Sequence, residues 1–200
     1  MNEKGVYLRT NPFSFLEIDA GAMLGVRYKW NKKFSAVLDP TFIFFNPYRG
    51  NFTGSSHPVG IKIRADIRYH INKPVFKRSR LFIAPEFHYK YRVKERLATF
   101  GINCINGNCA YYMEDIYKEI KTEIGGAAKA GFDIPIDARD RFAFELYGGL
   151  GLKVFQYKES SIPIGGSFFS EPSHQDFLGT SEGTATPIFF GSLKLSYRLR

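Results

Sequence analysis

In most of this chain, charged residues occupy every second position and apolar residues occupy the positions between them. We call these two sets of positions the charged parity and the apolar parity. Eight segments show the alternation, and on the apolar parity none of them carries Asp, Glu, Lys or Arg. A period of two is typical of a β-strand whose two faces meet different surroundings. We therefore expect an all-β fold, with strands in residues 5–15, 20–30, 34–45, 58–71, 80–93, 119–134, 141–156 and 189–200.

Three prolines fall inside these segments. Pro12, Pro40 and Pro85 cannot donate a hydrogen bond to a neighbouring strand. We expect local bulges at these positions, with the phase of the first segment slipping at Asn11-Pro12.

Composition supports β-structure and leaves the type of partner open. The 200 residues include 20 Phe, 12 Tyr and 19 Gly but only 3 Met and 1 Trp. This length suits one domain, residues 1–200. The net charge of +9 suits a partner such as nucleic acid, an anionic lipid surface or acidic glycans.

No apolar run reaches about 18 residues, so no membrane-spanning helix is expected. The first ten residues lack the apolar stretch of a signal peptide, so the chain is either cytosolic or the mature part of an exported protein.

The links between segments alternate in length. Links two, four and six are short, at 31–33, 72–79 and 135–140, whereas links three, five and seven are long, at 46–57, 94–118 and 157–183. Only the first link, near 16–19, departs from this trend. Short turns at one end and long loops at the other predict a single eight-stranded antiparallel up-and-down β-barrel, with both termini at the short-turn end.

Three features indicate which parity faces water. The segments exceed the 9–11 tilted residues that cross a bilayer, and Gly accompanies the charged parity, where it leaves room for long side chains. Aromatic residues of the apolar parity gather near segment ends, as expected at the two membrane interfaces. We therefore place the apolar parity against lipid, although a soluble, lipid-binding barrel with the opposite orientation is an alternative. The interface aromatics at the short-turn end are Trp30, Phe34, Tyr69, Phe132, Phe142 and Tyr197.

The pattern resembles that of small outer-membrane β-barrels, such as the transmembrane domain of OmpA and OmpX. The closing stretch "GSLKLSYRLR" looks like the C-terminal signal of that class, but it ends in Arg200 where an aromatic residue is usual. The resemblance implies a transmembrane barrel with short periplasmic turns and long extracellular loops, in the outer membrane of a Gram-negative bacterium. Outer-membrane lipid and lipopolysaccharide would then be its partners.

The charged parity predicts a polar barrel interior. Buried charges are tolerated when they are paired, so we expect a salt-bridge network that closes the barrel. The alternative is a narrow pore that favours anions, because the bases outnumber the acids. The expected network contains Arg9, Arg27, Asp39, Lys62, Arg64, Asp66, Arg68, Glu86, Lys90, Glu123, Lys129, Asp133, Glu145, Lys153, Lys194 and Arg198.

Two cysteines lie close together in "GINCINGNCAYY". Zinc normally requires four ligands and no second cluster follows, so a metal site is a weak interpretation. The intervening Ile-Asn-Gly-Asn favours a turn. We expect a disulfide between Cys104 and Cys109, with two free thiols as the alternative.

No residue pattern predicts catalysis or a cofactor. Ser173, His174 and Asp176 suggest a hydrolase, and some small outer-membrane barrels modify lipid A, but neighbouring loop residues rarely form a catalytic arrangement. We expect a non-enzymatic structural or surface-binding protein, adhesin-like or a subunit of an envelope complex.

Nucleic acid is not an expected partner. In a barrel, the basic residues of "HYKYRVKER" would lie in the interior and on the extracellular rim. The basic rim could contact lipopolysaccharide phosphates, and the long loops carry aromatic residues suited to an envelope partner: Arg92, Lys94 and Arg96, and Phe168, Phe169 and Phe177.

Overall fold

The computed structural model describes residues 4–16, 19–45, 57–71, 79–105, 108–137, 141–160, 166–168 and 183–199. These residues contain ten β-strands and one 3₁₀ helix, and they contain no α-helix. None of the helical structure in this described part is long and apolar enough to cross a membrane. The elements are β1 (Gly5–Thr10), η1 (Pro12–Leu16), β2 (Ala20–Met23), β3 (Gly25–Lys29), β4 (Phe34–Phe45), β5 (Val59–Ile71), β6 (Arg80–Ile102), β7 (Tyr111–Pro135), β8 (Phe142–Ser160), β9 (Gly166–Phe168) and β10 (Thr186–Arg198).

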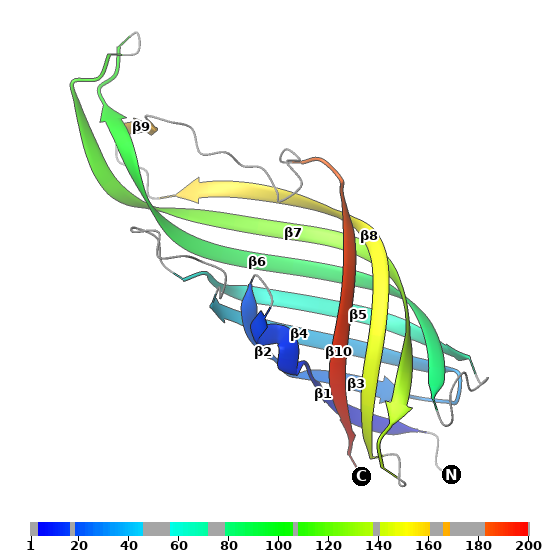
Figure 1. Cartoon of the computed structure of the whole chain (residues 1–200). Coiled ribbons are helices and arrows are strands. Elements are labelled where there is room, and N and C mark those ends of the chain that lie inside the picture. The colour runs from blue at the N-terminus through cyan, green and yellow to red at the C-terminus, as the bar shows by residue number, and fades with distance from the viewer. Residues whose placement is uncertain are drawn as a thin grey trace.

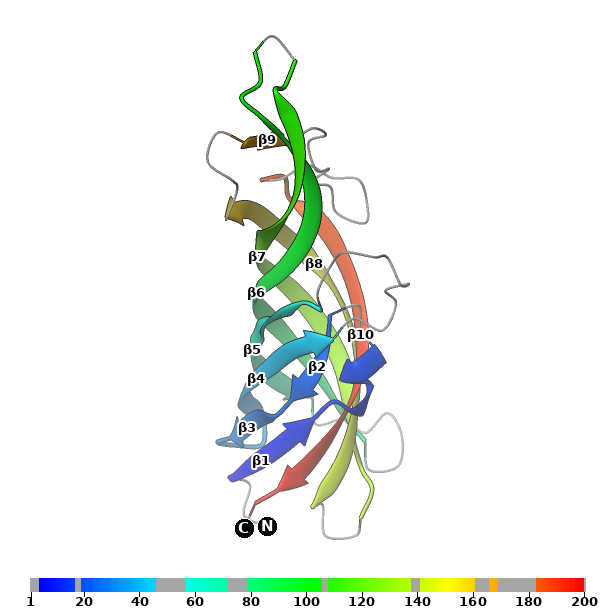
Figure 2. The same cartoon turned by 90° about the vertical axis from the view of Figure 1, so that its left-hand side faces the viewer.

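All of the strands belong to one antiparallel sheet that closes into a ring. Consecutive strands pair up and down, and the last strand, β10, pairs with the first, so that Leu8 lies opposite Tyr197. The circuit is completed by the pairing of β4 with β5, in which Phe34 lies opposite Tyr69. Figures 1 and 2 show both termini at the same end of the ring. The all-β, antiparallel, up-and-down prediction is therefore confirmed.

Segment 20–30 differs from the single strand expected. It is divided into β2 and β3, which both pair with β4. The register is the same on both sides of the break, with Met23 opposite Thr41 and Val26 opposite Leu38. Leu24 donates its amide hydrogen to the Pro40 carbonyl at 3.3 Å, but Pro40 has no amide hydrogen to donate in return.

The prediction of bulges at the prolines is therefore wrong. Pro40 removes one ladder bond without shifting the register, and Pro85 interrupts the β5–β6 pairing in the same way, between Asp66–Glu86 and Tyr69–Ile83. After Asn11, the first strand gives way to η1 instead of continuing with a bulge. The Ser14 hydroxyl donates to the carbonyl of Gly21 at 2.6 Å and ties η1 to β2.

The fifth link was expected to be long, with a helical turn or an extension of the hairpin as the two alternatives, and most of it is strand that extends the hairpin. β6 and β7 continue far beyond the neighbouring strands and pair from Arg80–Asp133 up to Ile102–Tyr111. Figure 1 shows this hairpin projecting past the other strands. Of the other long links, 46–56, 161–165 and 169–182 lie outside the described residues, including Ser173, His174 and Asp176.

Two side chains organise short turns at the opposite end. The Asn31 carboxamide accepts hydrogen bonds from the amides of Lys33 and Phe34, at 2.8 and 2.7 Å. The Asp137 carboxylate accepts from the amides of Arg141 and Phe142, at 2.7 and 2.9 Å. We call this the short-turn end of the ring, and the end from which the β6–β7 hairpin projects the long-loop end.

Candidate functional site: the charged interior of the ring

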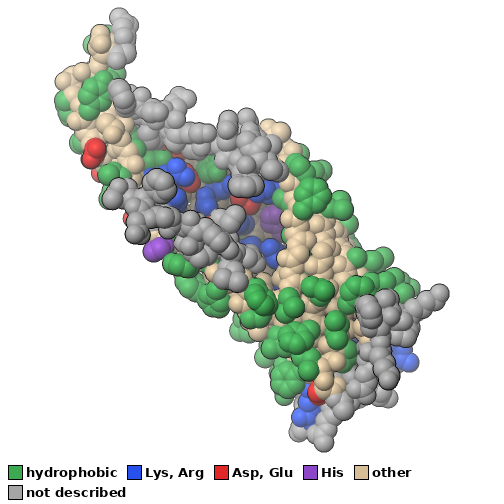
Figure 3. Space-filling view, in the orientation of Figure 1, with side chains coloured by type: hydrophobic (Ala, Val, Ile, Leu, Met, Phe, Trp, Pro, Cys, Tyr) green, Lys and Arg blue, Asp and Glu red, His purple; other side chains and the backbone are tan. Residues whose placement is uncertain are grey.

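The two faces of the sheet meet opposite surroundings. Large apolar side chains of one parity lie exposed on the outside of the ring, for example Leu150 and Phe42, which are 63 % and 61 % exposed. The other parity is enclosed by the ring, where Arg68, Glu145 and Lys194 are 0 % exposed. Figure 3 shows hydrophobic side chains over the outer surface and charged ones in the hollow near the long-loop end.

Ten buried charged residues form what we call the central network. It contains five bases and five acids: Arg9, Arg27, Arg68, Lys129 and Lys194 with Asp39, Asp66, Glu86, Asp133 and Glu145. Each comes from the inward parity of its strand, so the two-residue period of the sequence places them all inside. All ten belong to the network that the sequence predicts.

Glu145 on β8 is the hub of the central network. It accepts hydrogen bonds from Arg9 at 2.5 Å and from Arg68 at 2.8 Å, and a second Arg68 nitrogen lies 2.7 Å from its other oxygen. Arg9 also donates to both oxygens of Asp39 at 2.7 Å. Lys194 donates to Asp39 at 2.6 Å, so the hub joins strands β1, β4, β5, β8 and β10.

A second branch continues across the ring. Asp66 accepts from Arg68 at 2.7 Å and from Lys129 at 2.5 Å, and Lys129 also donates to Glu86 at 2.5 Å. Towards the short-turn end, Arg27 donates to Asp133 at 2.7 Å. Because opposite charges are present in equal number and in direct contact, the arrangement fills and neutralises the interior at this level.

Aromatic rings separate the bases of the network. Arg68 stacks over Phe82 with 4.3 Å to the ring centroid, and Arg27 over Tyr7 with 4.4 Å. The Tyr147 ring lies between Lys129 and Lys194, at 4.8 and 4.9 Å. Such cation–π contacts stabilise desolvated cations. These three aromatic residues were not predicted to line the interior, although each lies on the charged parity, which was the available signal.

A second group of charges, the mouth cluster, lies towards the long-loop end. It contains Asp19, Lys90, Arg92, Arg96, Glu119, Lys121, Glu123 and Lys153. Arg92 donates to Asp19 at 3.0 Å, and Lys90 pairs with the same carboxylate. Glu119 lies 2.9 Å from Arg96, and Lys121 lies 2.9 Å from Glu123. Burial alone would raise the pKa of Asp19, but Lys90 and Arg92 outweigh burial and hold it well below the ordinary range.

The structure places most of the predicted network in these two groups, and Lys62, Arg64 and Arg198 in neither. Lys90, Glu123 and Lys153 belong to the mouth cluster, with Lys153 3.7 Å from Glu123. Arg64 lies 3.9 Å from Glu86, and Lys62 is buried inside the ring. Arg198 is at the short-turn end, where it donates to the carbonyl of Lys4 at 3.1 Å. The prediction missed Asp19, which precedes β2, and Glu119 and Lys121, which continue the inward parity of β7.

The interface aromatics lie on the outer surface of the ring. Trp30 stacks on Phe34 with 6.2 Å between centroids, and Phe34 contacts Tyr69 at 5.4 Å. Phe142 on β8 contacts Tyr197 on β10, with 4.8 Å between the ring centroids. Phe132 is half-buried and lies opposite Leu81 and Leu146 on the neighbouring strands.

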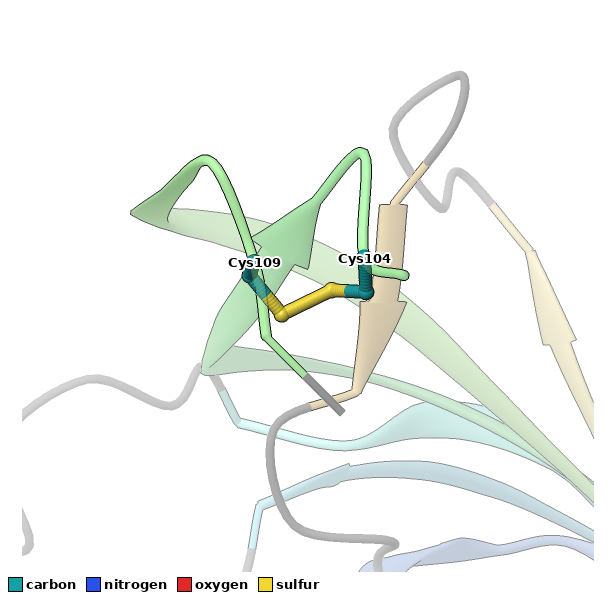
Figure 4. Close-up of a disulfide and its surroundings, with 2 residues drawn as sticks. All are labelled: Cys104 and Cys109. Carbon is teal, nitrogen blue, oxygen red and sulfur yellow. A yellow bond between two sulfur atoms is a disulfide. The ribbon is translucent and has the colours of Figure 1, made fainter. Parts of the chain in front are cut away.

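The projecting hairpin has its own small core and a disulfide near its tip. Phe100, Ile102 and Tyr117 are buried together, and burial raises the pKa of Tyr117. Cys104 and Cys109 are joined by a disulfide (Figure 4). The bond lies against Gly101, where a Cβ would come within 2.3 Å of a sulfur. The short strand β9 pairs with this part of β6. Large apolar side chains exposed on the hairpin are Leu97, Ile105, Tyr111, Tyr112 and Ile116.

Comparison with protein families, with curated proteins and with solved structures finds no match to this chain. In the part of the chain that the structure describes, no group of three or more His, Cys, Asp or Glu side chains is arranged to hold a metal ion.

Proposed function

We propose that this chain is an eight-stranded β-barrel of the outer membrane of a Gram-negative bacterium, with a non-enzymatic, surface-binding role. In this count β2 and β3 are one strand interrupted opposite Pro40, and β9 lies outside the barrel. The β6–β7 hairpin projects on the extracellular side, where it is the element suited to binding an envelope partner. Outer-membrane lipid and lipopolysaccharide surround the barrel.

One observation carries the proposal: the ring has ionised residues inside and apolar residues outside. A soluble barrel would bury Leu150 and expose Glu145, and this chain does the reverse. Strands of 12 and 13 residues, as in β4 and β5, are long enough to cross a bilayer at a tilt. Closure of the ring satisfies the edges of the sheet, as hydrocarbon requires.

The central network favours a closed barrel over the pore alternative. An ion needs a continuous polar path, and at the level of Glu145 the side chains from five strands meet in direct contact. The hairpin, by contrast, exposes Tyr112 and Ile116 beyond the ends of the neighbouring strands. Aromatic and aliphatic residues on such a projection are typical anchors for a protein partner.

The single tryptophan allows a direct test of membrane insertion. We expect Trp30 fluorescence in reconstituted vesicles to be quenched most by lipids brominated near the headgroup. The double variant Trp30→Phe with Leu38→Trp moves the probe along the outer surface towards the middle of β4, because Leu38 is 52 % exposed and lies four residues beyond Phe34. Its fluorescence should be quenched most by lipids brominated deep in the chains. A soluble barrel would give no depth-dependent quenching with either protein.

Conductance in planar bilayers separates the closed barrel from a pore. The wild type should give no steady current steps. As a positive control, the variant Arg68→Ser with Glu145→Ser removes the hub pair and should conduct, because it opens space without leaving either residue's charge behind. Stable, anion-selective steps from the wild type would refute the closed barrel and favour the pore.

A further inference from the structure

The outer face of β6, β7 and β8 changes character towards the long-loop end. Pairing aligns its residues in rows across the three strands, because directly opposite residues point to the same side of a sheet. Three successive rows towards that end are Tyr89–Ile124–Val154, Tyr91–Thr122–Gln156 and Val93–Ile120–Lys158. Ile124 and Val154 in the first row are exposed apolar side chains. Thr122 and Gln156 then bring a hydroxyl and a carboxamide to this face, and Lys158 brings a positive charge.

A groove with a volume of about 510 Å³ lies in the two polar rows. Its lining residues are Tyr91, Ile120, Thr122, Gln156, Tyr157 and Lys158. Gln156 and Lys158 are exposed, whereas Tyr91 and Thr122 are half-buried. The volume is within the range of sites that hold small molecules. The groove therefore combines an exposed cation with less exposed polar and aromatic groups, directly above the apolar surface.

Two lysines lie close together at the upper end of the groove. Lys118 is exposed on β7, two residues beyond Ile120, so it lies diagonally across the β7–β8 pair from Lys158. Lys118 has an acid, Glu95, directly opposite it on β6, whereas Lys158 lies opposite the apolar Ile120. Lys158 is therefore the better placed of the two to bind an external anion.

The bases that the sequence suggested for contacts with lipopolysaccharide lie among acids on the other parity of β6. Arg92 pairs with Asp19 and Glu119, and Arg96 also pairs with Glu119. Lys94 lies directly opposite Glu119 in the β6–β7 pairing. An anion that approaches the outer face next to the apolar surface meets Lys158 instead.

We propose that this groove binds the phosphorylated sugar headgroup of lipid A, the membrane anchor of lipopolysaccharide. The inference rests on the proposed function, which places the long-loop end in the outer leaflet. Lys158 forms a charge-assisted hydrogen bond with a phosphate. The Thr122 hydroxyl and the Gln156 carboxamide bond to polar groups of the sugar, and the acyl chains lie on the row below. A glycerophospholipid shares the phosphate and the chains but has no sugar ring for Thr122 and Gln156.

Native mass spectrometry of the folded barrel in detergent micelles measures this binding. When diphosphoryl lipid A is titrated into the micelles, the wild type should bind one molecule with saturation. Lys158→Gln should weaken the apparent affinity by about tenfold, because the charge-assisted bond to phosphate is lost. Lys33→Gln is the matched control, since it removes the same charge from an exposed lysine at the short-turn end, and it should bind lipid A as the wild type does.

Two further measurements separate recognition of the headgroup from attraction between any cation and any anionic lipid. Thr122→Val keeps the shape of the side chain but removes the hydroxyl. It should weaken lipid A binding by about threefold and leave the weaker binding of phosphatidylglycerol unchanged. Lipid A stripped of its phosphates should bind equally to the wild type and to Lys158→Gln, because Lys158 then has no phosphate to contact.

The groove is ruled out as the site if Lys158→Gln and Lys33→Gln weaken lipid A binding equally. It is also ruled out if phosphatidylglycerol binds as tightly as lipid A and Thr122→Val changes neither. Quenching of Trp30 by brominated lipids in the same proteins keeps this failure apart from a failure of the proposed function. Depth-dependent quenching together with either result leaves the barrel in the membrane and removes only the lipid A site. Without such quenching, the membrane assignment fails and the lipid A site fails with it.

Discussion

The central network and the mouth cluster use the same residue types on the same parity, but their surroundings differ. In the central network, Arg9, Arg68 and Glu145 have side chains that are fully enclosed. In the mouth cluster, Glu119 is buried but its partners Arg92 and Arg96 have side chains that are 14 % and 37 % exposed. Solvent therefore reaches Arg92 and Arg96 at the mouth, and none of the three hub residues. The same ion pair should therefore be far more costly to break at the centre than at the mouth.

The largest effect is expected from the hub. Glu145→Gln leaves the Arg9 and Arg68 guanidiniums with one less counter-charge in a sealed interior, which should cost about 3–5 kcal/mol of the free energy of unfolding. Urea unfolding in lipid vesicles measures this loss. The double variant Arg9→Gln with Glu145→Gln restores the balance of charge and should lose less than the two single variants combined.

Glu119→Gln is the matched substitution at the mouth. Because Arg92 and Arg96 reach solvent when the carboxylate is removed, the loss should be about 1 kcal/mol. Equal losses for Glu145→Gln and Glu119→Gln would show that water enters both regions alike, and the distinction between them would be wrong.

The difference between the two regions also explains what the sequence could predict. Where one face meets apolar surroundings and the other an enclosed polar space, parity separates the residues cleanly, and strands from residue 34 to 93 were located well. Beyond Val93 the consecutive charges Lys94, Glu95 and Arg96, which are all half-buried, end this alternation. The strand character of 94–102 and 111–118 therefore could not be predicted from period alone.

Parity assigns a residue to the interior but does not choose its partner. Arg9 and Glu145 are 136 residues apart in sequence, and their contact depends on the register of the pairings that close the ring. The equality of five bases and five acids in the central network likewise follows only from which level of the ring each residue reaches. The sequence count, which takes all levels together, shows an excess of bases and suggested a pore.

The hairpin tip should be independent of the ring. Replacing Cys104 and Cys109 with serine removes a short cross-link that stabilises the tip by about 2 kcal/mol at most, since the closed loop is small. Proteolysis near residues 103–110 should become faster, while the urea midpoint of the ring should not change. Reducing agent added to the wild type should reproduce both results. A shift of the ring midpoint would show that the tip and the ring unfold together.

The effect expected from Asp19 is as small as that expected from Glu119, and it carries a pH signature. Asp19→Asn removes the partner of Lys90 and Arg92 in a region that solvent reaches, so about 1 kcal/mol should be lost at pH 7. Because the folded pKa of Asp19 lies below its unfolded value, the carboxylate contributes fully above the unfolded pKa, and this contribution declines as the pH falls below about 4. The stability difference between the wild type and Asp19→Asn should therefore be constant from pH 7 to pH 5 and shrink below pH 4. A difference that grows on acidification would mean that Lys90 and Arg92 do not hold the charged form of Asp19, and the mouth cluster would then lack the ion pair that joins residue 19 to β6.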